Sequence, residues 1–140
     1  MAKVTFLLGL CGSGKSYYAR CLKLEHPEKE IFQDLIHENA IPRLIQSLSN
    51  GTDCIVEEFR YCFQGERDQI VQRLSSIVGI EIEWFCLEND LESANWNVQH
   101  RDDARNIAEH IDLNCRISPV YEYPAGAKII PITRVKCGCH

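Results

Sequence analysis

The amino-acid sequence predicts an α/β fold, built as one doubly wound sheet of parallel strands joined by helices. Short apolar runs rich in β-forming residues alternate along the chain with longer segments of helical period, which is typical of strands joined by crossover helices. No linker rich in Pro, Gly or Ser divides the 140 residues. Because this length is typical of one domain, we expect a single domain over residues 1–140.

In the first half of the chain the predicted elements alternate between strand and helix. They are a strand at Lys3–Leu8, a helix at 16–24, a short strand at 30–32 and a helix at 38–48. The helix at 38–48 carries apolar residues three and four positions apart, and Asn50-Gly51 supplies a stop signal. These apolar residues are Ile41, Leu44, Ile45 and Leu48. We therefore expect one face of this helix to pack against the sheet.

The second half of the chain continues the alternation. It comprises a strand at 53–57, a helix at 66–78, a strand at 80–87, a helix at 90–100, a helical stretch at 106–114 and a final short strand at 128–132. Gly79 closes the helix at 66–78, which is expected to turn five apolar residues inward: Ile70, Val71, Leu74, Ile77 and Val78. Trp84 and Phe85 are expected in the core as strand residues.

Composition and charge restrict the classes of function. The chain is 45% hydrophobic and 25% charged, which is typical of a globular protein with a core. Its net charge of −5 disfavours broad attraction to nucleic acid or anionic membrane, although a local basic cleft stays possible. No apolar run approaches the roughly 18–20 residues of a membrane span, and the N-terminal run does not resemble a secretory signal. We therefore expect a cytoplasmic protein with no membrane partner.

The eight cysteines are interpreted as structural thiols rather than disulfides. Most of them lie singly inside apolar segments, where a reduced thiol acts as a small core residue. The C-terminal Cys137-Gly138-Cys139-His140 has metal-ligating residue types but lacks a second ligand cluster at the spacing of structural zinc sites. We interpret it as a frayed terminus.

The strongest functional signal is the sequence Gly-Leu-Cys-Gly-Ser-Gly-Lys-Ser at residues 9–16, which fits the phosphate-loop pattern G-x-x-x-x-G-K-[ST]. It follows a predicted strand and opens a predicted helix, so backbone N–H groups can converge on an anion. The alternative is a glycine-rich turn between strand and helix that has a structural role and binds no ligand. We expect Lys15 to reach the β- and γ-phosphates of ATP and Ser16 to ligate Mg²⁺. The expected nucleotide-binding residues are Gly9, Gly12, Ser13, Gly14, Lys15 and Ser16, together with Arg105 further along the chain.

An acidic residue at the end of a neighbouring apolar strand is expected to hold the Mg²⁺ shell. Glu57 and Glu58 both follow such a run, and consecutive strand side chains point to opposite faces, so only one of them can aim at the metal. Glu57 is the first choice because it directly follows the apolar run. Glu58 is the second choice for this role. The alternative is that both residues are solvated acids at a strand end and hold no metal.

Three further residues are candidates for phosphoryl transfer. Asp34 follows the short second strand, where it could accept the proton of an acceptor hydroxyl, although it could instead cap the next helix. Arg101 and Arg105 lie four apart and on a helix would share a face, as the cations of a mobile lid. Asp102 and Asp103 could equally neutralise them in a solvated segment of salt bridges.

Across nearly its whole length the sequence resembles the P-loop kinases grouped with polynucleotide 5′-kinases and zeta-toxin-like small-molecule kinases. The segments that carry the resemblance are residues 9–16, the short strand with Asp34, residues 51–57, the helix with Glu66-Arg67, the strand ending at 85–88 and the tail at 121–132. The resemblance implies a three-layer P-loop NTPase fold like that of nucleoside kinases. In this fold a five-stranded parallel sheet sets the Glu57 strand beside the phosphate-loop strand. It also implies ATP with Mg²⁺ and transfer to a hydroxyl.

The chain departs from the pattern of these kinases at two positions. Members usually have Asp where this chain has Glu57, and a lid Arg is common at the position of Trp96, about five residues before Arg101. The second departure places more of the charge stabilisation on Arg101 and Arg105.

Three functions follow from the sequence as hypotheses. The first is an ATP-dependent kinase acting on a hydroxyl of a small molecule or nucleotide, with Lys15, Asp34 and Arg101 as catalytic residues. The second is a polynucleotide 5′-hydroxyl kinase. Such an enzyme would need a basic groove, but the sequence has no clustered tract of Lys and Arg, and its net negative charge also disfavours this function. The third is an ATP-binding switch with weak turnover, which Trp96 favours.

Overall fold

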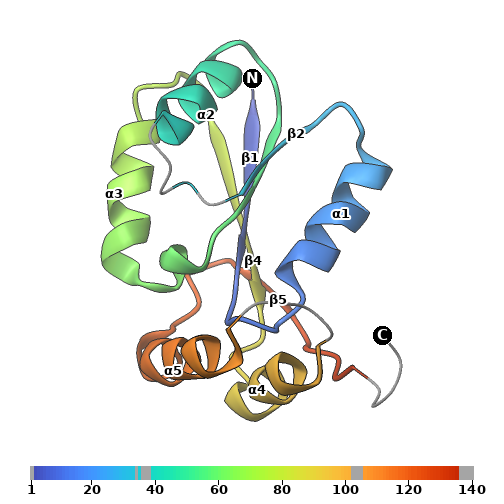
Figure 1. Ribbon diagram of the computed structural model, residues 1–140. Coiled ribbons are helices and arrows are strands. Elements are labelled where there is room, and N and C mark those ends of the chain that lie inside the picture. The colour runs from blue at the N-terminus through green and yellow to red at the C-terminus, as the bar shows by residue number, and fades with distance from the viewer. Residues whose placement is uncertain (1, 34, 36–38, 102–105, 136–140) are drawn as a thin grey trace.

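Five parallel strands form one sheet in the computed structural model, which describes residues 2–33, 35, 39–101 and 106–135 (Figure 1). The strands are β1 (Lys3–Leu8), β2 (Glu30–Gln33), β3 (Cys54–Glu57), β4 (Glu81–Leu87) and β5 (Lys128–Ile130). They lie side by side in the order β2-β3-β1-β4-β5, and every pair is parallel. The predicted α/β class and the five-stranded parallel sheet are confirmed.

Helices cover both faces of this sheet, and two more lie at the carboxyl ends of its strands (Figure 1). They are α1 (Lys15–Glu25), α2 (Ala40–Ser49), α3 (Gln64–Leu74), α4 (Leu91–His100) and α5 (Ile107–Ile117), with the short 3-10 helices η1 (Phe59–Cys62) and η2 (Ser118–Val120). In Figure 1, α1 lies on one side of the sheet and α2 and α3 lie on the other. The helices α4 and α5 lie below the carboxyl ends of the strands, where β1 leads into the loop before α1.

The central strand β1 has a core on each of its faces. Phe6 belongs to the larger core, which also contains residues of α2, η1 and α3, whereas Leu7 packs with Ala19 of α1 and Ile55 of β3 in a smaller core. Successive strand side chains alternate between the two faces, so a strand buried on both sides is apolar at consecutive positions. This explains why residues 4–8 of β1 are all buried.

The helix α3 ends earlier than its apolar period predicts. It stops at Leu74 rather than at residue 78, and Val71 and Val78 are 38% and 94% exposed, so their predicted inward orientation is wrong. The Ser75 hydroxyl donates to the carbonyl oxygen of Gln72 at 2.5 Å, and the Ser76 hydroxyl donates to that of Arg73 at 3.3 Å. Serine side chains that bond to helix carbonyls in this way favour the end of a helix over its continuation.

Other differences from the expected elements are small. The helix α5 continues three residues past Asn114, and β5 stops at Ile130 rather than at residue 132. The helices η1 and η2 were not predicted, because segments of three or four residues have no detectable period. Trp84 and Phe85 pack against the larger and the smaller core respectively, but both are only partly buried.

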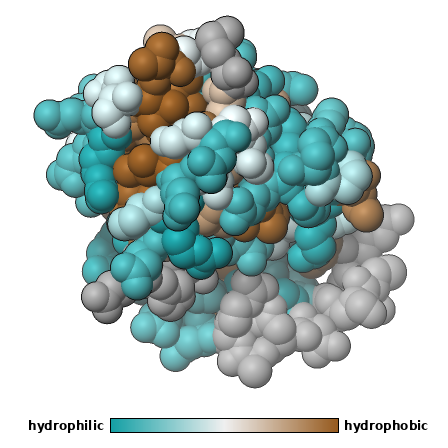
Figure 2. Space-filling model, turned by 90° about the horizontal axis from the view of Figure 1, so that it is seen from above, coloured by the Kyte–Doolittle hydropathy of each residue, from teal (hydrophilic) through white to brown (hydrophobic). Residues whose placement is uncertain are grey.

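The surface above the amino ends of the strands is mostly hydrophilic, and its hydrophobic residues form several separate areas (Figure 2). In the described part of the chain, no helix combines the length and the apolar character that crossing a membrane requires.

Candidate active site

The loop between β1 and α1 contains the predicted phosphate-binding motif, and two of its glycines have positive φ. Gly12 has φ +83°, and Gly14, the N-cap of α1, has φ +99°. A Cβ atom at Gly12 would lie 2.5 Å from the carbonyl oxygen of Ala94 in α4, whereas a Cβ at Gly14 would meet no atom within 4 Å. Gly12 is therefore required both by its backbone conformation and by close packing of the loop on α4.

The first turn of α1 suits an anion. The N-cap residue Gly14 supplies no side-chain cap, and the first turn contains no acidic residue. The first N–H groups of a helix have no partner within the helix, and the helix dipole favours negative charge there. The Lys15 ammonium lies in the same loop and donates to the carbonyl oxygens of Gly9 and Leu10, each at 2.9 Å. These residues fit a phosphate group.

A fully buried asparagine of α5 holds the middle of the loop. Asn114 Oδ1 accepts from the backbone N–H of Cys11 at 2.8 Å, and its Nδ2 donates to the carbonyl oxygen of Cys11 at 2.8 Å. The same Nδ2 donates to Asn95 Oδ1 of α4 at 3.0 Å. One side chain thus satisfies both backbone groups of Cys11 and links them to α4 and α5.

A second asparagine, Asn97 of α4, holds the next residue of the loop. Its Nδ2 donates to the carbonyl oxygens of Gly12, at 2.8 Å, and Thr133, at 3.0 Å. Its Oδ1 accepts from the N–H of Val135 at 2.7 Å. Asn97 is only 6% exposed. The phosphate loop and the segment after β5 are therefore fixed by the same amide.

Neither asparagine was identified from the sequence, although a weak signal for each was present. Asn97 lies between apolar positions of α4, with Ala94 three residues before and Val98 directly after, and Ile117 lies three residues after Asn114. A polar residue on the apolar face of a helix usually has a hydrogen-bond partner, because an unsatisfied buried amide is costly. The pattern alone does not identify that partner.

The structure brings Ser16 and Glu57 together from two elements. The Ser16 hydroxyl at the start of α1 donates to Oε1 of Glu57 at the end of β3. Glu57 Oε2 accepts from Nε2 of Gln33, the last residue of β2, at 2.6 Å. A hydroxyl and a carboxylate are hard oxygen ligands of the kind that Mg²⁺ takes together with water and phosphate oxygens. These two side chains fit that metal. Among the described residues no group of three or more His, Cys, Asp or Glu side chains forms a metal site of its own.

Glu58 lies on the opposite side of the chain from Glu57, as strand alternation requires. It is 2% exposed and caps η1 by accepting from the N–H of Arg60 at 3.2 Å. It also accepts from the N–H of Leu35 at 3.0 Å, which ties the segment after β2 to the end of β3. Of the two candidate acids, Glu57 is the one beside Ser16.

Of the two arginines predicted for a lid, the structure describes Arg101. Arg101 directly follows α4, which ends at His100 as expected, and it has extended conformation with φ −79° and ψ 150°. Its Nη2 lies 2.5 Å from Nδ1 of His110 in α5. Arg105 and the predicted base Asp34 lie outside the described residues.

Trp96 packs with the C-terminal segment. Its ring stacks on that of His100, with centroids 3.8 Å apart, and its Nε1 donates to the carbonyl oxygen of Val135 at 3.1 Å. The guanidinium of Arg134 lies 5.6 Å from the centroid of the Trp96 ring. The residue at the position of the common lid arginine therefore contributes to packing here.

A buried thiol lies close to the phosphate loop. Burial raises the pKa of Cys62 to about 12, although the charge of Lys15 and a hydrogen bond with the backbone of Gly9 act in the opposite direction. The Cys62 thiol is therefore protonated and uncharged at neutral pH, and it acts as a small buried residue beside the phosphate loop. The six cysteines in the described part of the chain are free, which agrees with their interpretation as thiols, and Cys137 and Cys139 lie outside it.

Comparison with solved structures supports the fold assignment. The chain is similar to a gluconokinase from Sinorhizobium meliloti 1021, with a TM-score of 0.65, 11% identity, and coverage of 95% of this chain and 84% of that chain. It is also similar to a fungal RNA kinase, with a TM-score of 0.62, 15% identity, and coverage of 99% and 79%. A third similar structure is a sugar kinase from Janibacter sp. HTCC2649, with a TM-score of 0.60, 13% identity, and coverage of 94% and 85%.

No protein-family model matches the sequence, and no curated protein matches it. The likeness to the solved structures is thus one of fold. That fold is the P-loop kinase fold that the sequence predicted.

Proposed function

We propose that this protein is an ATP-dependent kinase that transfers the γ-phosphoryl group of ATP to a hydroxyl of a small molecule or nucleotide. The observation that carries the proposal is the hydrogen bond from the Ser16 hydroxyl to Glu57. It joins the last residue of the phosphate-loop motif to the acid at the end of the neighbouring strand, which is the pair that a P-loop enzyme needs to hold Mg²⁺. The kinases among the similar structures support the same activity.

In this proposal the loop residues hold the nucleotide. ATP supplies the transferred phosphoryl group, and Mg²⁺ offsets the charge of the phosphates. The N–H groups at the start of α1 and the Lys15 ammonium bind phosphate oxygens, and Lys15 exchanges its bonds to the carbonyls of Gly9 and Leu10 for them. Ser16 and Glu57 would hold Mg²⁺ when it is bound. The hydrogen bonds of Asn97 and Asn114 keep the loop in shape for this task.

The acceptor is activated by Asp34 and the developing charge is stabilised by arginine. The acceptor oxygen forms a bond to the γ-phosphorus, the bond from that phosphorus to the bridging oxygen breaks, and Asp34 takes the proton of the hydroxyl. Asp34 directly follows Gln33, the residue that ends β2 and bonds to Glu57. Arg101 and Arg105 carry positive charge to the transferred group.

A small-molecule or nucleotide acceptor is favoured over a polynucleotide. The net charge of −5 gives weak general attraction to a polyanion. The similar structures include sugar kinases as well as an RNA kinase, so the fold is compatible with both kinds of acceptor.

The test is a transfer assay with γ-labelled ATP, Mg²⁺ and a panel of polyols, sugar acids, nucleosides and 5′-hydroxyl oligonucleotides. We expect label in one class of small acceptor. Lys15→Ala should abolish transfer and weaken ATP binding, whereas the control Arg20→Ala, at an exposed position of α1, should leave both unchanged. Asp34→Asn should lower turnover by roughly 10²–10⁴-fold at unchanged ATP affinity, and Asp112→Asn serves as its control.

Three results would contradict the proposal. Label found only in oligonucleotides would assign a polynucleotide kinase. ATP binding with no transfer to any acceptor would indicate a nucleotide-dependent switch, and gain of transfer by Trp96→Arg would strengthen that assignment. Equal ATP affinity in Lys15→Ala and the parent protein would remove the nucleotide site from the loop.

A further inference from the structure

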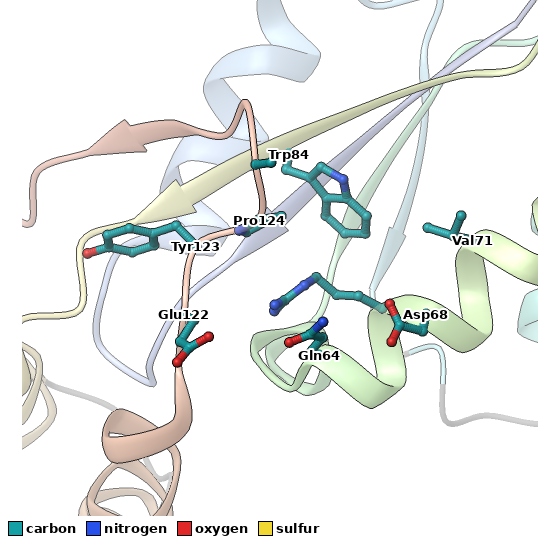
Figure 3. Close-up of a pocket in the computed structure, with 9 residues that line it drawn as sticks. Gln64, Asp68, Val71, Trp84, Glu122, Tyr123 and Pro124 are labelled. Carbon is teal, nitrogen blue, oxygen red and sulfur yellow. The ribbon is translucent and has the colours of Figure 1, made fainter.

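A pocket of about 290 Å³ lies between α3, β4 and the segment that follows η2 (Figure 3). In Figure 3, Trp84 comes from the strand, Gln64 and Asp68 come from the helix, and Glu122 comes from the segment, and all four border the same space. The volume is at the lower end of the range for ligand pockets, so it suits a ligand with one ring.

This pocket is on the opposite face of the sheet from α1. Trp84 stacks on Phe6, with ring centroids 4.6 Å apart, and Phe6 belongs to the larger core on the side of α2 and α3. The next residue, Phe85, points to the other face and meets Tyr18 of α1, with centroids 6.0 Å apart. The pocket therefore lies on the face of the sheet opposite α1, and no residue of the phosphate loop lines it.

Arg67 of α3 lines the pocket as a buried cation that has no counter-ion among the described residues. It is 6% exposed, and in the part of the chain that the structure describes the one hydrogen bond of its guanidinium runs from Nη1 to the carbonyl oxygen of Tyr61, at 2.7 Å. None of the ion pairs among the described residues includes Arg67, although Asp68 and Glu122 line the same pocket. A guanidinium stays charged at any ordinary pH and has five N–H donors. Burying such a group without a partner is costly, so it favours an anionic ligand.

The other lining residues restrict the chemistry of that ligand. The Trp84 ring is packed on Phe6 on one side and borders the pocket, so it offers an apolar, aromatic surface beside the cation. Asp68 and Glu122 are exposed and bring two negative charges to the same space. They disfavour a phosphate, which carries nearly two negative charges, and they can accept from N–H or O–H groups. A single carboxylate matches the planar guanidinium and the overall charge better.

We propose that this pocket is a second ligand site, which binds a small aromatic carboxylate that also carries N–H or O–H donors. The carboxylate pairs with Arg67, the ring lies against Trp84, and the donors face Asp68 and Glu122. The site is independent of the nucleotide site, so the proposal does not rest on kinase activity.

The first test is a titration of the ¹⁵N-labelled full-length protein, followed by the NMR shifts of the Trp84 indole N–H and the Gln64 amide group. The probes are 4-hydroxyphenylacetate, its neutral amide 4-hydroxyphenylacetamide, and phenyl phosphate. We expect saturable binding of the carboxylate and at least tenfold weaker binding of the amide and the phosphate. The affinity for the carboxylate should be unchanged at saturating ATP.

The second test uses variants of the pocket. Arg67→Met should weaken binding of 4-hydroxyphenylacetate at least tenfold, because it removes the cation that pairs with the carboxylate. It also leaves the carbonyl oxygen of Tyr61 without its partner, so urea denaturation should show some loss of stability. Val71→Trp, at a partly exposed position of α3, should fill the pocket and also block binding, whereas Gln72→Trp on the same helix should not. If Arg67→Met fails to fold, the comparison of Val71→Trp with Gln72→Trp still tests the proposed site.

Several outcomes overturn the proposal. They are the absence of saturable shifts at about 10 mM probe, equal binding of the acid and its amide, unchanged binding in Val71→Trp, and competition between the probe and ATP. None of these outcomes depends on phosphoryl transfer, which is measured separately.

Discussion

At the scale of single residues, the shape of the phosphate loop depends on two amides that are not part of its motif. Asn114 occupies both backbone groups of Cys11, and Asn97 binds the carbonyl of Gly12. A buried backbone group that loses its partner costs about 1–3 kcal/mol. These two side chains therefore contribute to stability and to the geometry of the candidate site at once.

Asn114→Ala tests this role. It leaves the N–H and the carbonyl oxygen of Cys11 without their partner, so the free energy of unfolding should fall by about 1–3 kcal/mol, and ATP binding should weaken. Urea denaturation measures the first effect and calorimetry measures the second. The exposed Asn50, changed to Ala, is the control and should alter stability by less than about 0.5 kcal/mol. Equal effects of the two substitutions would contradict the assignment.

The sequence predicted the motif residues of the site but not the two asparagines that bind the loop. The reason is that these asparagines are far from the loop along the chain. The motif is a local pattern of eight residues, and Ser16 with Glu57 follows from two strand ends that meet at one edge of a parallel sheet. The partners of Asn97 and Asn114 in the loop are 85 and 103 residues away. No periodicity or spacing rule links such positions.

At the scale of elements, α4 depends on its N-cap as well as on its buried face. Asp90 accepts from the N–H of Ser93 at 3.0 Å, and this hydrogen bond is the main reason that the pKa of the Asp90 carboxyl is lowered. A lowered pKa in the folded state means that the carboxylate stabilises the fold above its ordinary pKa. This stabilisation is lost as the pH falls through the folded-state value.

Asp90→Ala should therefore destabilise the protein in a pH-dependent way. At pH 7 the loss should be about 1 kcal/mol, within the usual range for a removed N-cap. As the pH falls below the ordinary pKa of Asp, about 3.9, and then through the lowered folded-state value, the parent carboxyl becomes protonated, so the difference between parent and variant should shrink. Urea unfolding at pH 7 and at pH 3 measures both values. Asp90→Asn, which keeps a capping oxygen, should lose less at pH 7, and a difference that is the same at both pH values would exclude this role.

The five longer helices and the five strands were all predicted from period and breakers, whereas some of their ends were not. The hydrophobic period of residues 66–78 continues past Leu74, but the hydroxyls of Ser75 and Ser76 bond to the carbonyls of the last turn and the helix ends there. A local competition of this kind changes an end by a few residues without changing the element. The end of α4 at His100, in contrast, agrees with the expected bound.

At the scale of the whole molecule, the cysteines report on the integrity of the core. Cys54, Cys62 and Cys86 are completely buried, and Cys115 on α5 is exposed. Burial raises the pKa of Cys54 and of Cys62 to about 12 and also raises that of Cys86. The thiolate is the reactive form, so these three groups are protected both by access and by protonation.

Thiol labelling of the native protein at pH 8 should therefore modify Cys115 rapidly and these three cysteines only on unfolding. Peptide mass spectrometry after timed labelling identifies the sites, and in concentrated urea all four should react at similar rates. Cys115→Ser is the control that removes the rapid labelling of the peptide that contains position 115, while the other cysteines are followed in their own peptides. Labelling of Cys62 at the rate of Cys115 in the native protein would mean that the buried region around Cys62, beside Lys15, opens to solvent.

The bonds of Asn97 and Asn114 also affect the order in which the site is completed during synthesis. The ribosome releases residues 9–16 early, but the amides that hold Cys11 and Gly12 belong to α5 and α4, and Asn97 itself is tied to Thr133 and Val135. A nascent chain that ends before residue 114 has strands β1 to β4 but lacks the amide that holds Cys11. The loop thus gains its full set of supports only when the residues up to Val135 have left the exit tunnel, which makes nucleotide affinity a marker of folding that appears after β1 to β4 have been synthesised.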